Sequence, residues 1–394
     1  MFKRTHKESF FLRDLSILLF RLALVCAISS PAAAAVHDGG VGACSYCHVH
    51  HSESGGSGPS LLLSASGPSS LCLNCHYGAG SPTTASVMSP DGSAMTPGGD
   101  FYWLNKDFTW SGGSSPGTSH GHNVLAVDYG LDLDSVRTEA PGGTYPSGSM
   151  SCISCHDPHG RSRSGSAAVS GSGSYGGTAP GGAMLGNYRL LGGVGYQPPG
   201  ATFSFVNPAP VAAQNPLLPF GETDVSHVDY GSGMSDWCAN CHFSYLPTHA
   251  NTDGSAFKHS SDVQMQTGKI NRYNRYVSTD DLLGTSVTAY LQFVPFERGP
   301  GSTGTLDPTS TQGVDSNSQV MCLTCHRAHG SAFRVGARWD MDATLLVDSH
   351  PANGDGGVVG NDVLNSYYGR DIATDFGVGQ KQFCDKCHNN VPPH

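Results

Sequence analysis

The pattern Cys-x-x-Cys-His occurs six times in this chain of 394 residues. Two thiols separated by two residues can each bond one vinyl group of the same porphyrin, and the imidazole that follows then lies under the iron as its proximal ligand. The repeat predicts six covalently attached haem c groups, with these thiols and proximal imidazoles: Cys44, Cys47 and His48; Cys72, Cys75 and His76; Cys152, Cys155 and His156; Cys238, Cys241 and His242; Cys322, Cys325 and His326; Cys384, Cys387 and His388.

Zinc is the competing ligand for such cysteine pairs. In a structural zinc ribbon, two Cys-x-x-Cys pairs hold one tetrahedral ion. A ribbon does not need His directly after the second Cys, whereas all six motifs here have it. The pattern therefore favours haem attachment over zinc ribbons and over six redox-active dithiols.

The N-terminal segment has the composition of a secretory signal peptide. Basic residues, among them Lys3, Arg4 and Arg13, precede a mostly apolar stretch at 15–29, and the alanines at 33–35 offer a cleavage site. We predict a cleaved signal peptide over 1–35 and a single hexahaem cytochrome domain over 36–394. The mature protein is then secreted, extracellular or on the cell surface.

Removal of this segment also accounts for the odd cysteine. The chain has 13 Cys, and the six motifs use all of them except Cys26, which lies inside the predicted signal peptide. The alternative is that Cys26 is the lipid-attachment cysteine of a lipoprotein. The preceding Val25 is larger than the small residue that lipoprotein processing prefers at that position. With no spare thiol for a disulfide, the covalent cross-links are thioethers to porphyrin.

The composition between the motifs is poor in regular structure. The chain has 52 Gly and 24 Pro, and the stretch at 161–182 is rich in Gly and Ser. Each porphyrin is a large apolar body that such a chain can bury in place of Leu and Val. We predict a multihaem cytochrome c fold: mostly loop and turn, very little strand, and short helices at the motifs, wrapped around a continuous haem stack. One further helix is predicted after Ser278, from an apolar set that includes Leu282, Tyr290 and Phe293.

The charge of the chain limits its partners. The formal charge is −10 at pH 7, and loss of the basic signal peptide makes it more negative. An acidic surface repels phosphate backbones, so we expect no nucleic-acid partner. No stretch after the signal peptide is apolar enough to span a bilayer, so we expect no membrane span in the mature chain.

The second axial ligand of each iron decides between electron transfer and catalysis. The mature chain also contains methionines, so the number of candidate ligands does not exclude His/Met ligation. Imidazoles are also sufficient for six bis-His haems, because twelve His lie outside the motifs after residue 35: His37, His50, His51, His120, His122, His159, His227, His249, His259, His329, His350 and His394.

Three of these histidines share one offset from a proximal ligand. His51, His159 and His329 each lie three residues beyond the proximal His of their motif. Such a side chain cannot reach over its own porphyrin, so it would ligate a different haem and hold the two irons within tunnelling distance. His50 competes with His51, and His120 with His122; spacing leaves both pairs open.

The chain also resembles a known family over essentially its whole mature length. It is similar to the OmcS-type extracellular hexahaem cytochromes, which polymerise into conductive filaments called cytochrome nanowires. Beyond the order of the motifs, the resemblance rests on these segments: Met95-Thr-Pro-Gly-Gly-Asp-Phe101, Gly121-His-Asn-Val124, Ala140-Pro-Gly-Gly-Thr-Tyr145, Cys155-His-Asp-Pro-His-Gly160, Tyr188-Arg-Leu-Leu-Gly192, Gly195-Tyr-Gln-Pro198, Gly233-Met-Ser-Asp-Trp-Cys-Ala-Asn-Cys-His242, Ala289-Tyr-Leu291, Cys325-His-Arg-Ala-His329 and Tyr367-Tyr-Gly-Arg370.

The resemblance implies bis-His ligation throughout. It nominates as distal ligands His37, His51, His122, His159, His249 and His329. It further implies that His51 reaches the haem on His326 of a neighbouring subunit. The chain departs from the family pattern in its additional histidines: His50, His120, His227, His259, His350 and His394.

These observations favour an electron-transfer protein over an enzyme. The predicted function is extracellular electron transfer along a head-to-tail filament of copies of this chain, since a heterologous contact that does not close generates an open polymer. Its expected partners are outer-membrane or periplasmic donor cytochromes and an external acceptor such as a mineral, an electrode or a partner cell. The alternatives are a monomeric exported electron carrier and, with less support because all six motifs keep their His, a multihaem reductase.

Overall fold

The computed structural model describes residues 47–48, 65–78, 86–158, 188–214, 221–246, 261, 263–299 and 306–389. The chain divides into two units, Met1–Ala35 and Val36–His394. The first unit lies outside the described residues, so the signal peptide over 1–35 stays a prediction, and all described elements belong to the second unit.

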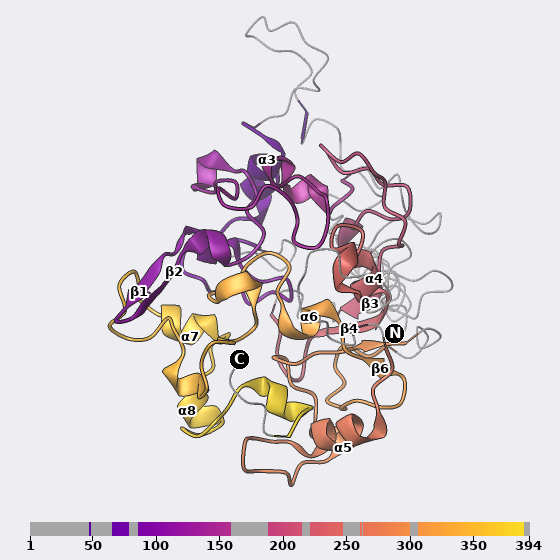
Figure 1. The fold of residues 1–394 in the computed structure, drawn as a ribbon, viewed down its shortest axis with the longest axis vertical. Helices are drawn as coiled ribbons and strands as arrows, with labels where there is room; N and C mark the ends of the chain where they lie inside the picture. Colours follow the sequence, from indigo (N-terminus) through magenta and orange to yellow (C-terminus); the bar gives the residue numbers. More distant parts are fainter. Residues whose placement is uncertain are drawn as a thin grey trace, which may run out of the picture. The chain divides into compact units, whose positions relative to one another are not determined.

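The helices are short and are joined by long irregular stretches, which confirms the predicted loop-rich fold (Figure 1). The α-helices are α3 (Pro68–His76), α4 (Met234–Cys238), α5 (Thr267–Arg275), α6 (Cys322–Cys325), α7 (Asp362–Ser366) and α8 (Ile372–Asp375). The 3₁₀-helices are η1 (Phe101–Asn105), η2 (Gly117–Ser119), η3 (Val127–Tyr129), η4 (Ser147–Ser149), η5 (Cys152–Ser154), η6 (Tyr188–Leu190), η7 (Phe243–Tyr245), η8 (Ser286–Thr288), η10 (Arg334–Gly336), η11 (Leu346–Asp348) and η12 (Phe383–Lys386). None of the helices within the described ranges is long and apolar enough to cross a membrane.

Five of the six attachment motifs lie in or beside a short helix, as predicted: α3, η5, α4, α6 and η12. The same local bond closes four of these turns, because the backbone N–H of the proximal His donates to the carbonyl of the first Cys. The nitrogen–oxygen distances are 3.0 Å at His156, 3.0 Å at His242, 3.1 Å at His326 and 2.9 Å at His388. One helical turn therefore presents both thiols and the imidazole of a motif together.

A small sheet holds the fourth and fifth motifs beside each other. Its strands β3 (Val211–Gln214), β4 (Val228–Ser232), β5 (Glu297–Arg298) and β6 (Ser318–Gln319) lie in that order. β4 pairs parallel with β5, at Tyr230 and Glu297, and the other two pairings are antiparallel. Since α4 follows β4 and α6 follows β6, the sheet sets the spacing of the two motifs.

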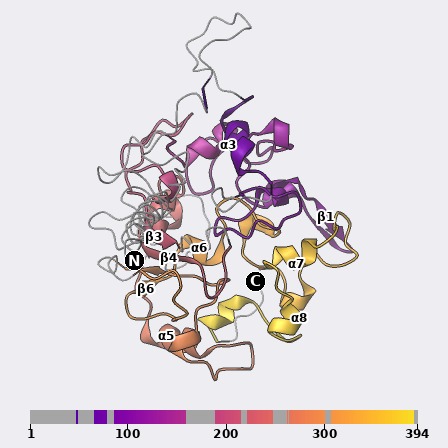
Figure 2. The same ribbon diagram turned by 180° about the vertical axis from the view of Figure 1, so that it is seen from behind.

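The remaining two strands form a hairpin near the C-terminal helices. β1 (Phe108–Trp110) pairs antiparallel with β2 (Gly113–Ser115). An isolated bridge joins Thr109 to Gly356, and the view from behind shows the hairpin beside the segment that leads to α7 (Figure 2).

The apolar core consists of several clusters rather than one. An aromatic cluster in the C-terminal half is centred on Phe383, which stacks on Phe293 with ring centroids 5.0 Å apart and meets Trp339 edge-on at 5.7 Å. A second cluster packs Tyr230 of β4 with Met321, next to α6, and a third surrounds Leu73 of α3. This division fits a chain whose largest apolar bodies would be porphyrins.

The helix predicted after Ser278 is wrong. Ser278 and Asp281 form an isolated antiparallel bridge, and the Asp281 carboxylate accepts from the N–H of Leu283 at 2.9 Å, so the acidic residue closes a tight turn. Leu283 is 86% exposed, whereas Tyr290 and Phe293 are buried. The apolar residues therefore share no single face, and the helix of this region, α5, ends earlier at Arg275.

Candidate haem-binding site

Two pairs of histidines face each other across the described part of the chain. The ring centroids of His122 and His242 are 5.9 Å apart, and those of His156 and His329 are 6.3 Å apart. Each pair joins one predicted proximal ligand to one predicted distal ligand. In the second pair, His329 faces the imidazole of the third motif rather than that of its own.

The spacing of these rings fits a metal ion between two imidazoles. Metal–nitrogen bonds of about 2 Å on each side place the two ring centroids about 6 Å apart. Three of the four Nδ1 atoms are engaged elsewhere: that of His122 lies 2.6 Å from the Ala328 carbonyl oxygen, that of His242 lies 2.7 Å from Pro141 O, and that of His156 lies 2.9 Å from Arg189 O. A carbonyl can only accept, so Nδ1 carries the proton and Nε2 keeps its lone pair for a metal.

Burial lowers the pKa of His122, His242 and His329 and so favours the neutral imidazole, which is the state that binds iron. Desolvation, together with the neighbouring His122, lowers the pKa of His242 to about 4. Desolvation and the nearby His156 lower the pKa of His329 to about 3. The residues present therefore fit a haem iron between the members of each pair.

His120 and His122 have different surroundings in the structure. His120 is fully buried, and its ring nitrogens contact Ser115 Oγ at 2.7 Å and the Trp103 carbonyl oxygen at 2.9 Å. Its ring also stacks on Phe108, with centroids 5.7 Å apart. Both nitrogens of His120 are thus occupied by the core, which leaves His122 as the side chain that faces a proximal His.

One backbone bridge positions both predicted distal imidazoles, those of His122 and His329. Gly121 and Gly330 pair antiparallel, and the N–H of His122 donates to the carbonyl of His329 at 3.0 Å. A Cβ on Gly121 would lie 2.3 Å from the His329 carbonyl oxygen, so only glycine allows this approach. The His329 ring stacks on Phe101 at 4.8 Å between centroids, which fixes its orientation toward His156.

Thiols of successive motifs lie close enough to affect one another. A hydrogen bond with Cys152 raises the pKa of Cys72, and one with Cys322 raises that of Cys238. Burial, together with the charge of Cys241, raises the pKa of Cys155 to about 12. Burial, together with the charges of Cys384 and Cys387, likewise raises the pKa of Cys325. From the second motif to the sixth, the described motifs are therefore neighbours in sequence order.

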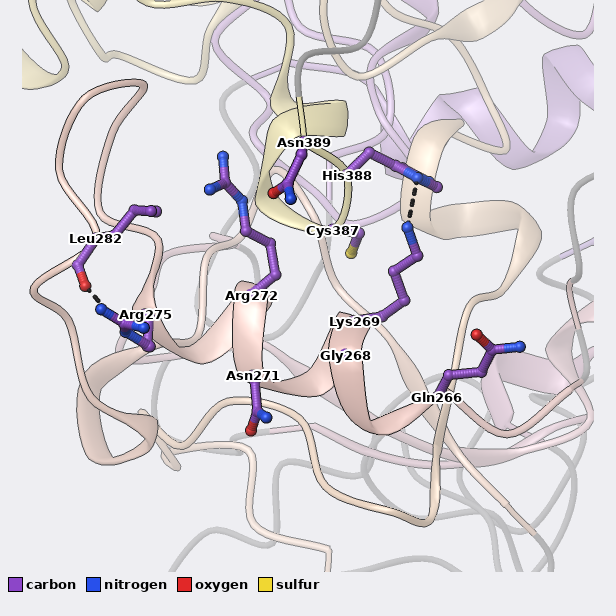
Figure 3. A pocket seen from close by; sticks show the side chains of 10 residues that line it. All are labelled: Gln266, Gly268, Lys269, Asn271, Arg272, Arg275, Leu282, Cys387, His388 and Asn389. Atoms are coloured by element: carbon purple, nitrogen blue, oxygen red, sulfur yellow. Dashed lines mark hydrogen bonds between the residues drawn. The ribbon is translucent and has the colours of Figure 1, made fainter.

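The sixth motif lies in a cavity of about 630 Å³ beside α5. Figure 3 shows that Lys269 and Arg272 of α5 and His388 line this cavity, with the Lys269 ammonium pointing at the imidazole. The distance from Lys269 Nζ to His388 Nδ1 is 2.9 Å. This basic lining was not predicted, because α5 lies more than 100 residues before the sixth motif in the sequence.

A buried ion cluster beside the fifth motif was also missed. Glu222 accepts from Arg327 Nη1 and from Arg338 Nη1, each at 2.9 Å, and all three side chains are at most 1% exposed. Arg327 lies between His326 and His329 in the sequence. This position between two predicted ligands is the sequence signal from which the cluster could have been suspected. Its guanidinium carbon lies 3.5 Å from the centroid of the Tyr368 ring.

Two further histidines have packing partners instead of a facing imidazole. His227 stacks on Tyr290 with centroids 3.6 Å apart. His350 stacks on Trp110 at 4.0 Å, and its Nδ1 lies 2.6 Å from an Asp355 carboxylate oxygen.

The structure does not reach every predicted site residue. Cys47, His48, Cys75 and His76 are described. The following lie outside the described residues and stay predictions: Cys44, His37, His51, His159 and His249, as do the unassigned His50, His259 and His394.

Comparison with known proteins places the chain in a family. No family model matches it. The C-type cytochrome OmcS of Geobacter sulfurreducens is 37% identical to it, over 95% of this chain and 99% of the relative. An Outer Membrane Cytochrome S filament from the same organism shares the fold with a TM-score of 0.72 and 35% identity, covering 89% of this chain and 99% of that one. A cryo-EM structure of OmcS nanowires from Geobacter sulfurreducens matches with a TM-score of 0.71 and 36% identity, again over 89% of this chain and 99% of that one. The chain therefore belongs to the OmcS family of c-type cytochromes, electron-transfer proteins that carry haem c.

Proposed function

We propose that this chain is a hexahaem subunit that polymerises head to tail outside the cell and conducts respiratory electrons along the polymer. The carrying observation is that each facing pair joins the proximal imidazole of one motif to a histidine from elsewhere in the chain, His242 with His122 and His156 with His329. Similarity to two solved filaments, each matched over 99% of its length, supports assembly.

Each described pair supports a specific ligation. His122 would be the distal ligand of the haem on His242, and His329 that of the haem on His156. Each bound haem would supply a one-electron couple, and the chain's part is to hold both imidazoles at fixed distance and, at His122, His242 and His156, to keep Nδ1 protonated. The other four distal positions are proposed for His37, His51, His159 and His249.

The proposed junction between subunits is His51, donated to the haem on His326 of the next copy. An imidazole lent to a neighbour makes assembly and ligand completion one event. His326 supports this role because its Nδ1 lies 3.0 Å from the Val335 carbonyl oxygen, which leaves Nε2 available. Such a filament would receive electrons from outer-membrane or periplasmic cytochromes and deliver them to a mineral, an electrode or a partner cell.

Replacement of His50 and His51 together by Ala tests the junction. We expect the double variant to keep six haems by mass but to give no fibres in electron micrographs of secreted material, because the neighbour's iron loses its ligand. The single variant His50→Ala is the control and should assemble. Fibres formed by the double variant would contradict the proposed bridge, and compact particles from the unaltered chain would favour a monomeric carrier.

A further inference from the structure

A buried serine joins the second attachment motif to the third. Ser69 lies in α3, three residues before Cys72, and is 0% exposed. Its Oγ accepts from the backbone N–H of Cys152 at 3.3 Å, and its hydroxyl also contacts the Cys152 thiol. The Cys72 thiol is hydrogen-bonded to the same thiol. The first cysteines of the two motifs are therefore in contact, with Ser69 beside them.

The fourth and fifth motifs repeat this arrangement. Ser235 lies in α4, three residues before Cys238, and is likewise 0% exposed. Its hydroxyl contacts the Cys322 thiol and donates to a Glu297 carboxylate oxygen at 3.2 Å. The Cys238 thiol is hydrogen-bonded to that of Cys322. Since α4 contacts α6 as α3 contacts η5, the same residue types at the same offsets build both junctions.

The later motif of each pair has a further feature in common. Ser154 Oγ accepts from the N–H of Ser151 at 2.9 Å, and Thr324 Oγ1 accepts from the N–H of Met321 at 3.0 Å. Both hydroxyl residues are buried and stand directly before the second Cys of their motif, where the second and fourth motifs have Asn. Motifs two to five therefore alternate between two designs, and one motif of each design makes a unit.

The contacting sulfur atoms stand for thioether sulfurs of the protein with haem attached, each bonded to a vinyl-derived carbon of its porphyrin. A thioether has no S–H, so van der Waals contact between the two sulfurs would replace the bond between the thiols. The hydrogen bond from the Cys152 N–H to Ser69 Oγ needs no thiol and is kept. Two porphyrins whose linking sulfurs touch are held edge to edge.

We infer that Ser69 is a positioning residue that holds the haems of the second and third motifs edge to edge, and that Ser235 has this role for the haems of the fourth and fifth motifs. The inference rests on the proposed function, because it needs haems at these four motifs. The rate of electron tunnelling falls steeply with edge separation, so fixed sulfur contacts would keep transfer within each pair fast. Electrons would then cross the subunit through two equivalent two-haem units.

Circular dichroism in the Soret band tests both roles on the purified hexahaem protein. Neighbouring haems give an exciton couplet whose size depends on the distance and angle between them. Ser69→Ala and Ser235→Ala should each lose part of the couplet, because one junction loosens in each variant. The double variant should lose the sum of the two parts, since the two junctions share no residue. A spectrum of either single variant that superimposes on that of the unaltered protein would overturn the inference.

Ser70→Ala is the matched control on α3. Ser70 follows Ser69 and is 1% exposed, but its Oγ lies 3.0 Å from Ser66 Oγ. Both α3 variants remove a hydroxyl from a hydrogen bond and should lower the unfolding temperature to a similar extent, whereas Ser70→Ala should keep the whole couplet. Equal losses of the couplet would assign the effect to a loosened helix and refute the role of Ser69.

Haem content measured by mass spectrometry separates the two hypotheses. An unaltered chain with fewer than six haems would refute the hexahaem assignment and the inference with it. Six haems in both proteins, with an unchanged couplet in Ser69→Ala, would refute the inference alone.

Discussion

Two histidines that are separated by one residue have different roles in this protein. His120 is held by Ser115 and Trp103 inside the core, whereas His122 presents a free Nε2 to His242 because its Nδ1 is bound to Ala328 O. In the proposed ligation, the partners of the ring nitrogens therefore distinguish the two histidines, which residue type alone does not.

This difference predicts opposite outcomes for two substitutions. His122→Ala should produce one high-spin ferric haem, because the iron on His242 loses its distal ligand. His120→Gln should keep all haems low-spin and lower the unfolding temperature, because the core loses a matched pair of hydrogen bonds. Electron paramagnetic resonance and thermal unfolding measure the two effects, and an entirely low-spin His122→Ala protein would refute the assignment.

Sequence reasoning reached the attachment turns because their chemistry is local. A thiol pair followed by His specifies one helical turn, and the bond from the His N–H to the first Cys carbonyl recurs at four motifs. The choice between His120 and His122 was out of reach, because it depends on Ala328, which is 206 residues away in the chain.

Among the elements, the bridge between Gly121 and Gly330 has the strictest requirement. It aligns the imidazoles of His122 and His329, and a Cβ on Gly121 would collide with the backbone of His329. Periodicity could not have predicted this contact, since neither segment is a strand or a helix of any length. The same absence of a continuous apolar face explains why the helix predicted after Ser278 failed.

Gly121→Ala should damage two haem sites at once. The added methyl group forces the bridge apart, at a cost of about 1–3 kcal/mol in the free energy of unfolding. We expect partial high-spin character at the haems on both His156 and His242. Gly148→Ala is the control, because a Cβ there meets nothing within 4 Å; equal destabilisation of both variants would show that the bridge has no special role.

Across the whole molecule, buried charges connect distant segments. Glu222 joins Arg327 and Arg338, and Arg338 also donates to the carbonyls of Leu323 at 2.6 Å and Gln292 at 2.7 Å. Burial alone would raise the pKa of Glu222, but Arg338 and Arg327 reverse this and hold it below its ordinary value. In the sequence these are three separate charged residues; the fold brings them together as one buried ion cluster.

Glu222→Gln should therefore destabilise the protein by about 3–5 kcal/mol at neutral pH, because two arginines lose their buried counter-charge. A carboxylate with a lowered pKa contributes stability that is complete above its ordinary pKa of about 4.3 and is lost as the pH falls below it. Unfolding in denaturant at several pH values should show this acid loss in the unaltered protein and less of it in Glu222→Gln. Asp342→Asn removes the exposed pair with Arg334 and should change stability little; an equal loss there would contradict the prediction.

The pairing of His122 with a carbonyl 206 residues later has a consequence for the timing of biogenesis. A chain exported N-terminus first presents its third and fourth motifs for haem attachment well before residues 328–330 emerge. The haem on His156 would have one axial ligand, and be open to reaction with small molecules, until His329 arrives; the haem on His242 would have His122 nearby but without the bridge that orients it. We expect the two coordination spheres to close together, as a single late step of maturation.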